Sequence, residues 1–221
     1  AGIGLIISIV ALLYLSLHLI STKTNEIDEH RSALSVQGAI QTSVNRVSSL
    51  VIDNAVWDDA VREVYSPTLD TTWLYNTWGA GFKINNLYDG TFILDEHFSV
   101  LWGSFQSKPF TETDLEFFGQ GLKAIIAQHR RALSSDKNIY AGITQTRHGV
   151  AFVGIGLVRP MVGRLQVNND TRRYLVITRH LNAKIVSDLG ATFQIDNLNY
   201  TADKINDMSM PLHSSAGELL G

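Results

Sequence analysis

Residues 138–158 read NIYAGITQTRHGVAFVGIGLV, two runs rich in apolar and β-branched residues that are joined by RHG. Such runs around a short connection that contains Gly are typical of a β-hairpin. A second pair, TFILD (91–95) and FSVLWGSF (98–105), is separated by a tight connection, and RRYLVITR (172–179) supplies a further strand. Because hairpins join antiparallel strands, the sequence predicts a mainly antiparallel sheet.

Helices are expected around these strands. A short helix is predicted over TTWLYNTWGAGF, capped by Asp70, and a sequence similar to a capping box, TETD, opens a helix over 111–133. A third helix is expected over 182–189 and ends at Gly190, and ATFQI (191–195) is a last strand candidate. Hairpins placed among helices predict an α+β domain of the PAS-like or Cache-like kind.

The first twenty residues, AGIGLIISIVALLYLSLHLI, contain no Asp, Glu, Lys or Arg. As a helix they span about 30 Å, the thickness of the bilayer hydrocarbon core, so we expect a transmembrane helix over 1–20. A core helix rarely runs so long without a charge, and LHLISTKTNE offers no convincing signal-peptide cleavage site. Since the chain does not begin with Met, we expect it to be a fragment.

A long helix is expected to follow this anchor. Residues 24–65 contain no Pro and one Gly, and their apolar residues recur at helical spacing in a seven-residue frame. Ser66 and Pro67 then stop the helix. We therefore predict a stalk or signalling helix over 21–66, packed on the domain from about residue 45, and the rest of a PAS/Cache-like domain over 67–221.

The end of this helix departs from the frame. Asn54 and Asp58 take positions where apolar residues are expected, and Trp57 lies between them. A carboxylate buried without partners is costly, so it is paired, protonated or part of a site, and a structural and a ligand-facing role both stay open. Together with Trp73 and Arg179, these residues offer the mixture of apolar surface and few polar anchors that is typical of a small-molecule pocket.

Composition and motifs exclude several classes of function. The 221 residues carry a net charge of −3 and no Cys, which argues against nucleic-acid binding and excludes disulfides and thiolate metal sites. The seven His residues stand singly, so no metal site is indicated, and neither GxSxG nor a P-loop is present. Gly154 and Gly156 lie within a predicted strand and indicate close backbone packing. We predict no catalytic residue, and the sequence leaves any cofactor unknown.

The segment DNAVWDDAVREVY, followed by TxWLYNTW and the hairpin FILDEHFSVLWGS, resembles the fourth class of CHASE sensor domains. The most specific match is WDDA (57–60), although Val61 replaces the Tyr that follows it in the family. The resemblance covers most of residues 25–215. It implies a periplasmic sensory domain, anchored in the inner membrane of a bacterial or archaeal signalling protein.

The same resemblance implies a mechanism and partners. A small ligand would bind the domain, which is not itself an enzyme, and the N-terminal helix would relay the signal to a cytoplasmic output. Outputs in the family are often diguanylate cyclases and phosphodiesterases of cyclic-di-GMP, or histidine kinases, and the activity of the full-length parent stays open. A homodimer is expected. The alternative is a dimerisation or periplasmic protein-docking module without a small-molecule ligand.

Overall fold

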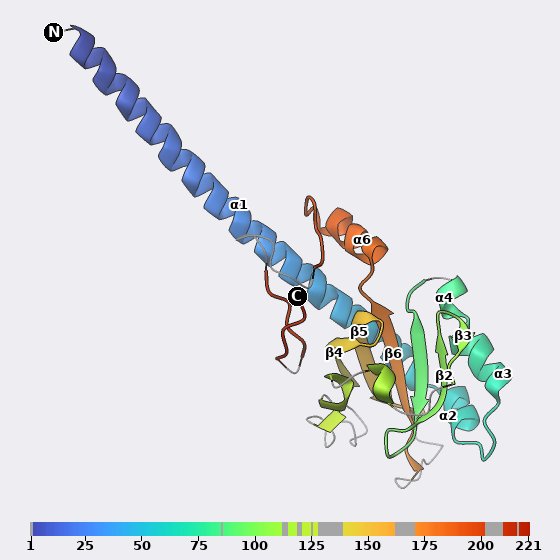
Figure 1. The fold of residues 1–221 in the computed structure, drawn as a ribbon. Coiled ribbons are helices and arrows are strands. Elements are labelled where there is room, and N and C mark those ends of the chain that lie inside the picture. Colours follow the sequence, from blue (N-terminus) through green and yellow to red (C-terminus); the bar gives the residue numbers. More distant parts are fainter. Residues whose placement is uncertain are drawn as a thin grey trace.

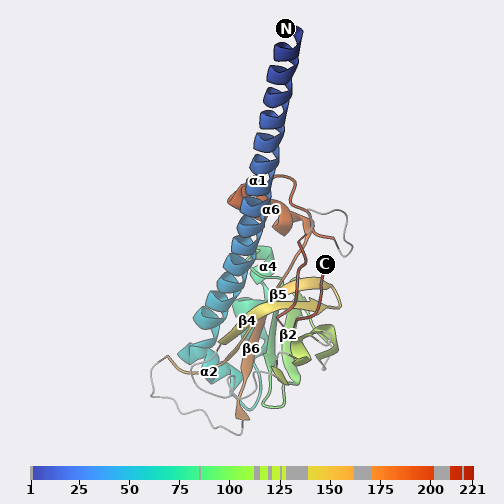
Figure 2. The ribbon, with the colours of Figure 1, turned by 90° about the vertical axis from the view of Figure 1, so that its left-hand side faces the viewer.

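A computed structural model gives the fold of the chain (Figure 1). It describes residues 2–84, 86–111, 115–118, 121–124, 126–127, 139–161, 171–201, 210–215 and 217–221, without the side chains of residues 2–11, 115 and 116. One long helix projects from an α+β body, and the two views in Figures 1 and 2 show the N-terminus far from that body.

Helix α1 (Gly2–Ala55) is 54 residues long, which corresponds to a length of about 80 Å. Residues 12–32 are exposed, whereas the last third of the helix packs across β4, β5 and β6. Val47, Val51 and Ala55, spaced at three or four residues, are buried in that contact. The helix therefore combines a projecting segment with a segment that belongs to the core.

The expected anchor coincides with the start of α1. Among the residues that the structure describes, no helix is both long and apolar enough to cross a membrane. Much of the span predicted over 1–20 falls on residues 1–11, whose side chains lie outside the described part of the chain.

The prediction of one uninterrupted helix to Tyr65 is wrong. Helix α1 ends at Ala55, and α2 (Asp58–Val64) begins after two residues of non-helical backbone. The backbone of Arg159 causes the break: its N–H donates to Ala55 O at 2.9 Å, and its carbonyl accepts the Trp57 N–H at 3.1 Å. Hydrogen bonds to a distant segment thus replace two that would have continued the helix.

The sheet has six strands in the order β3-β2-β1-β6-β5-β4, and every neighbouring pair is antiparallel. This confirms the α+β class, the antiparallel sheet and both predicted hairpins. The strands are β1 (Gly90–Leu94), β2 (Val100–Phe105), β3 (Lys108–Pro109), β4 (Ile139–Thr146), β5 (Gly149–Leu157) and β6 (Tyr174–His180).

Glycines in β5 let α1 approach the sheet closely, as the sequence predicted. A Cβ at Gly154 would lie 2.7 Å from Val51 Cγ2 and 2.9 Å from Val47 Cγ1, and one at Gly156 would lie 2.7 Å from Val51 Cγ1. One buried core lies between α1 and the sheet. A second core covers the opposite face, where Phe92 contacts Phe118 with ring centroids 4.8 Å apart.

Short helices cover the end of α1. Helix α3 (Thr71–Leu74) starts at Asp70, whose carboxylate accepts the N–H groups of Thr72 at 3.0 Å and Trp73 at 2.9 Å, which confirms the predicted cap. A π-helical turn, η1 (Tyr75–Gly79), and α4 (Gly81–Ile84) follow. About half of the helix predicted over 111–133 falls outside the described residues. Within the described ones, η2 (Leu115–Phe118) is a 3-10 turn, and residues 121–124 and 126–127 are helical, as predicted.

Helix α6 (Ala183–Phe193) lies where a helix was expected over 182–189, and Asn182 caps its start by accepting the Ile185 N–H at 3.0 Å. Its predicted end at Gly190 and the strand predicted over 191–195 are wrong. The helix continues to Phe193, and Gln194 caps its end with a left-handed backbone. A Cβ on Gly190 would lie 3.1 Å from Ile195 O, so this glycine lets the returning chain approach.

Candidate functional site

The break between α1 and α2 contacts the turn that follows β5. Val56 pairs with Arg159 in a parallel bridge, and the carboxylate of Asp58 accepts the Met161 N–H at 2.9 Å. Asp58 is thereby held at the first turn of α2, where its negative charge also interacts favourably with the helix dipole. The neighbouring Asp59 instead makes an exposed ion pair with Arg62.

Three tryptophans and an asparagine gather beside this break, and we call them, together with Asp58, the α1-end cluster. The ring centroids of Trp57 and Trp73 lie 5.6 Å apart, and those of Trp73 and Trp78 lie 5.5 Å apart at a nearly perpendicular angle. Trp78 is fully buried, and its Nε1–H donates to Asn54 Oδ1 at 3.1 Å. Trp57, Trp73 and Asn54 are half-buried.

The structure does not bring Arg179 to this cluster. Arg179 lies near the end of β6 on the face that α1 covers, half-buried. Burial lowers its pKa, as does the nearby charge of Arg46, whereas Asp188 and Asp89 raise it. Arg46 precedes Trp57 by eleven residues, about 16 Å along the helix. Within the described part of the chain, the buried Nε of Arg179 has no hydrogen-bond partner.

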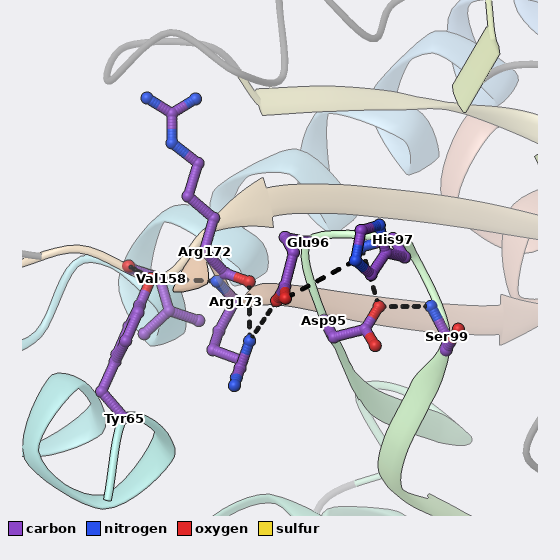
Figure 3. Close-up of polar contacts among 8 residues, drawn as sticks. All are labelled: Tyr65, Asp95, Glu96, His97, Ser99, Val158, Arg172 and Arg173. Carbon is purple, nitrogen blue, oxygen red and sulfur yellow. Dashed lines mark hydrogen bonds and ion pairs between the residues drawn. The ribbon is translucent and has the colours of Figure 1, made fainter. Parts of the chain in front are cut away.

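Tyr65, at the end of α2, ties this helix to the sheet (Figure 3). Its hydroxyl donates to Val158 O at 2.9 Å and accepts the Arg173 N–H at 3.0 Å. Burial raises the pKa of Tyr65 to about 12, although the hydrogen bond from Arg173 acts in the opposite direction. The end of β5 and the start of β6 are thus joined through one side chain of α2.

Figure 3 also shows that the β1–β2 turn joins the same network. Arg173 Nη1 lies 2.6 Å from Glu96 Oε2, and the Asp95 carboxylate accepts the N–H groups of His97 at 2.9 Å and Ser99 at 2.7 Å. The hydrogen bond from its own backbone N–H is the largest effect and lowers the pKa of Glu96. Desolvation opposes it, and Arg173 and His97 lower the pKa further. Residues from α2, β6 and this turn therefore form one polar network.

A buried polar cluster that the sequence did not predict lies on the opposite face of the sheet. His180 Nδ1 is 3.0 Å from both carboxylate oxygens of Asp89, and His180 Nε2 is 2.7 Å from Thr146 Oγ1. The Thr178 hydroxyl also donates to Asp89, at 3.0 Å. Asp89 and His180 are 8% and 7% exposed. Their only sequence signal is the two-residue alternation of β6, which places Thr178 and His180 on one face.

The order of carboxylate, imidazole and hydroxyl in this cluster matches that of a hydrolase triad. However, Thr146 Oγ1 also donates to Gly149 O at 2.9 Å and accepts the His148 N–H at 3.0 Å. Thr146 is 4% exposed, and its hydroxyl is engaged in these hydrogen bonds to the β4–β5 turn. The cluster therefore acts as a structural connection between β6 and the β4–β5 turn.

Two open pockets, each of about 700 Å³, lie away from the α1-end cluster. One is lined by α1 residues from Glu26 to Gly38 together with Phe193 of α6. The other lies between α6 and the chain from Ile195 to Tyr200. In the described ranges, no group of three or more His, Cys, Asp or Glu side chains could hold a metal ion.

A known structure shares this fold. The extracellular domain of a protein assigned as the histidine kinase vpHK1S-Z8 matches 81% of this chain with a TM-score of 0.51 and 17% identity. This chain spans 62% of the length of that domain. Two structures of the periplasmic domain of Vibrio cholerae LuxQ match 76% of this chain and 71% of their own, with TM-scores of 0.45 and 0.46 and identities of 13% and 14%.

No curated protein sequence matches the chain. A family model does: the CHASE4 domain matches residues 39–200, which include the α1-end cluster, the whole sheet and α6. The match confirms the resemblance that WDDA indicated. It extends over more than half of the chain, which is a sensor domain and not a catalytic one. The chain belongs to the CHASE4 domain family.

Proposed function

We propose that this chain is the periplasmic sensory domain of a signalling protein anchored in the inner membrane by residues 1–20. It binds a small ligand, and α1 relays binding to a cytoplasmic output that makes or degrades cyclic-di-GMP. The observation that carries the proposal is the continuity of α1, which runs unbroken from its projecting segment to the α1-end cluster. A displacement at that cluster can therefore move the projecting segment.

The segment 159–161 supplies the coupling. It is bonded to α1 through Ala55 and to α2 through Asp58. A ligand that competes with the Met161 N–H for the Asp58 carboxylate would loosen this connection. It would change the equilibrium between two packings of α1 by its difference in affinity for them, which is the requirement for any such relay.

The ligand residues proposed from the sequence divide into two places. Asn54, Trp57, Asp58 and Trp73 lie together, and half-buried indole rings beside a carboxylate suit an apolar or cationic ligand. Arg179 lies apart on β6, where a half-buried guanidinium whose Nε has no hydrogen-bond partner among the described residues would favour an anion. We assign the relay to the first group because only that group contacts the break between the two helices.

The test is a ligand panel of amino acids, organic acids, polyamines, sugars and divalent cations. Thermal unfolding and tryptophan fluorescence of the 221-residue chain report binding, and Asp58→Ala separates the cluster from other sites. A hit should lose its thermal shift in Asp58→Ala and should change cyclic-di-GMP levels in cells that express the complete parent protein. A panel without any hit, or a hit that Asp58→Ala leaves unchanged, contradicts direct sensing at this cluster.

A dimerisation or protein-docking module without a small ligand is the second candidate. The observation in its favour is the exposure of large apolar residues on the projecting part of α1, such as Ile27 and Leu34. Failure of the ligand panel together with self-association of the chain would support this function over sensing.

A further inference from the structure

A buried cationic group on β6 lacks a partner within its own domain. Among the residues that the structure describes, the Nε atom of Arg179 is buried and has no hydrogen-bond partner. A guanidinium stays charged in a protein, and a charge taken out of water without a counter-charge is costly. Because buried polar groups are nearly always paired, this one calls for an explanation. A group that binds from solution would supply the missing partner.

Arg179 lies beside α1 at the level of Arg46. Strand alternation places Arg179 on the face of β6 that carries Ile177, which belongs to the core between α1 and the sheet. Ile177 pairs with Gly154 of β5, against which Val47 of α1 packs closely. Arg46 directly precedes Val47 and is exposed, and its charge adds to the effect of burial in lowering the pKa of Arg179. The helix and the strand thus bring two guanidinium groups near each other.

The carboxylates near Arg179 are engaged elsewhere. Asp188 forms an exposed ion pair at 2.9 Å with a lysine one turn earlier in α6. Asp89 accepts the backbone N–H of His180 at 2.7 Å and contacts the ring of the same residue. Both carboxylates raise the pKa of Arg179, but in the described ranges neither Arg46 nor Arg179 forms an ion pair. The positive charge between α1 and β6 is therefore not neutralised by a direct contact in this part of the chain.

We propose that Arg46 and Arg179 bind the carboxylate of a small organic acid between α1 and β6. A guanidinium donates two parallel N–H bonds to a carboxylate, and it is more weakly hydrated than the ammonium group of lysine. The floor of the site is apolar, since Arg179 pairs with Phe152, which is 2% exposed, and Ile177 lies two residues away on the same face, fully buried. Such a floor suits a singly charged carboxylate better than a phosphate, which would lose more hydration there.

This site goes beyond the sensing proposed for the α1-end cluster and requires no ligand there. An acid held by both arginines would connect α1 to β6 and stabilise the packing of the helix that it recognises. It would therefore act on α1 at a second place, between the projecting segment and the α1-end cluster.

Acetate, succinate and benzoate, each titrated into the 221-residue chain, test the site by thermal unfolding and calorimetry. At least one should bind, and Arg46→Gln should weaken its affinity about tenfold or more, because charged hydrogen bonds are lost. Arg31→Gln, which changes an exposed arginine of the same helix, is the matched control and should leave the affinity unchanged. Asp58→Ala should also leave it unchanged, which separates this site from the α1-end cluster.

Arg179→Met tests the buried cation itself. Methionine is flexible and uncharged, so this variant should abolish binding and raise the melting temperature of the chain without added acid. A lower melting temperature would show that Arg179 is already compensated within the fold, and it overturns the proposal. Binding of none of the three acids, undiminished binding by Arg46→Gln, loss of binding in Asp58→Ala, or tighter binding of inorganic phosphate or sulfate overturns it as well. Because Arg46 is exposed, Arg46→Gln should fold like the parent chain and keeps the test decisive.

Discussion

The carboxylate of Asp58 accepts a 2.9 Å hydrogen bond from the backbone N–H of Met161, 103 residues later in the chain. Asp58 is the first residue of α2, and Met161 follows the segment that pairs with the end of α1. One side chain thus holds together the helix break and the turn after β5. Since Met161 is 67% exposed, the bond lies where a ligand can reach it.

Asp58→Ala should lower the free energy of unfolding by about 1 kcal/mol, the typical contribution of one hydrogen bond. Asp58→Asn keeps an acceptor oxygen and should stay close to the parent chain. Hydrogen exchange at Met161 should accelerate in the alanine variant alone. Asp59→Ala is the matched control, because Asp59 makes an exposed ion pair with Arg62 instead.

Signalling should depend on Asp58 more strongly than stability does. If the cluster is the relay, Asp58→Ala in the complete parent protein should change the cyclic-di-GMP response at temperatures where the domain stays folded. A loss of response that only follows the loss of thermal stability would make Asp58 a purely structural residue.

Asn54→Ala should destabilise the chain by about 1–3 kcal/mol, because it leaves a buried N–H donor without an acceptor. The donor is Nε1 of Trp78, which is fully buried and 3.1 Å from Asn54 Oδ1. Chemical denaturation measures the change. Asn45→Ala, which removes an exposed amide that accepts from Gln41 at 2.9 Å, should change stability little.

Local sequence signals predicted the elements of the fold better than their ends. Both hairpins and the cap Asp70 could be predicted because strand alternation and capping depend on neighbouring residues. The end of α1 could not, because the group that breaks the helix is the backbone of Arg159, far along the chain. Gly190 was misread as a helix end because its role is a close approach of Ile195, which only the tertiary fold reveals.

In the candidate site, too, only residues that are close in the sequence could be grouped by prediction. Asn54, Trp57 and Asp58 are near neighbours on two consecutive helices, so sequence could group them. Arg179 could not be placed, since the distance along α1 at which β6 meets the helix depends on sheet topology. The buried pair of Asp89 and His180 left no motif, because the two residues are joined only by the pairing of β1 with β6.

Tyr65→Phe should destabilise the chain near neutral pH, because Val158 O and the Arg173 N–H lose their partner. The pKa of Tyr65 is raised from 10.0 to about 12 in the fold, so the neutral phenol contributes stability that is fully present below pH 10. That contribution falls by about 3 kcal/mol as the pH rises to the folded value. The melting temperature should therefore fall less steeply with rising pH above pH 10 in Tyr65→Phe than in the parent chain.

Glu96→Gln should make the stability of the chain less dependent on pH under acidic conditions. The pKa of Glu96 is lowered from 4.5, chiefly by its own backbone N–H and also by Arg173. The stability it contributes is present above pH 4.5 and is lost as the pH falls through the lowered value. Melting temperatures measured between about pH 5 and pH 3 should fall less in Glu96→Gln. Glu29→Gln, in the exposed part of α1, should leave the curve unchanged.

Two glycine substitutions should shift stability in opposite directions. Gly38→Ala places a methyl group in open space within a helix, so it should stabilise the monomeric chain by about 1 kcal/mol. For a chain of this size that raises the melting temperature by about 2–4 °C. Gly154→Ala should destabilise it by about 1–3 kcal/mol, because the methyl group would overlap Val51 and Val47 of α1.

The two variants distinguish a glycine that the fold requires from one that it does not. Gly154 is required by the packing of α1 on β5, so the chain alone explains it, and its substitution should lower stability at every protein concentration. Gly38 is unnecessary for the isolated fold, so a stabilised monomer is the expected result in dilute solution. Chemical denaturation of both variants beside the parent chain measures the two changes. A destabilised Gly38→Ala monomer would instead show that α1 already packs at this position within one chain.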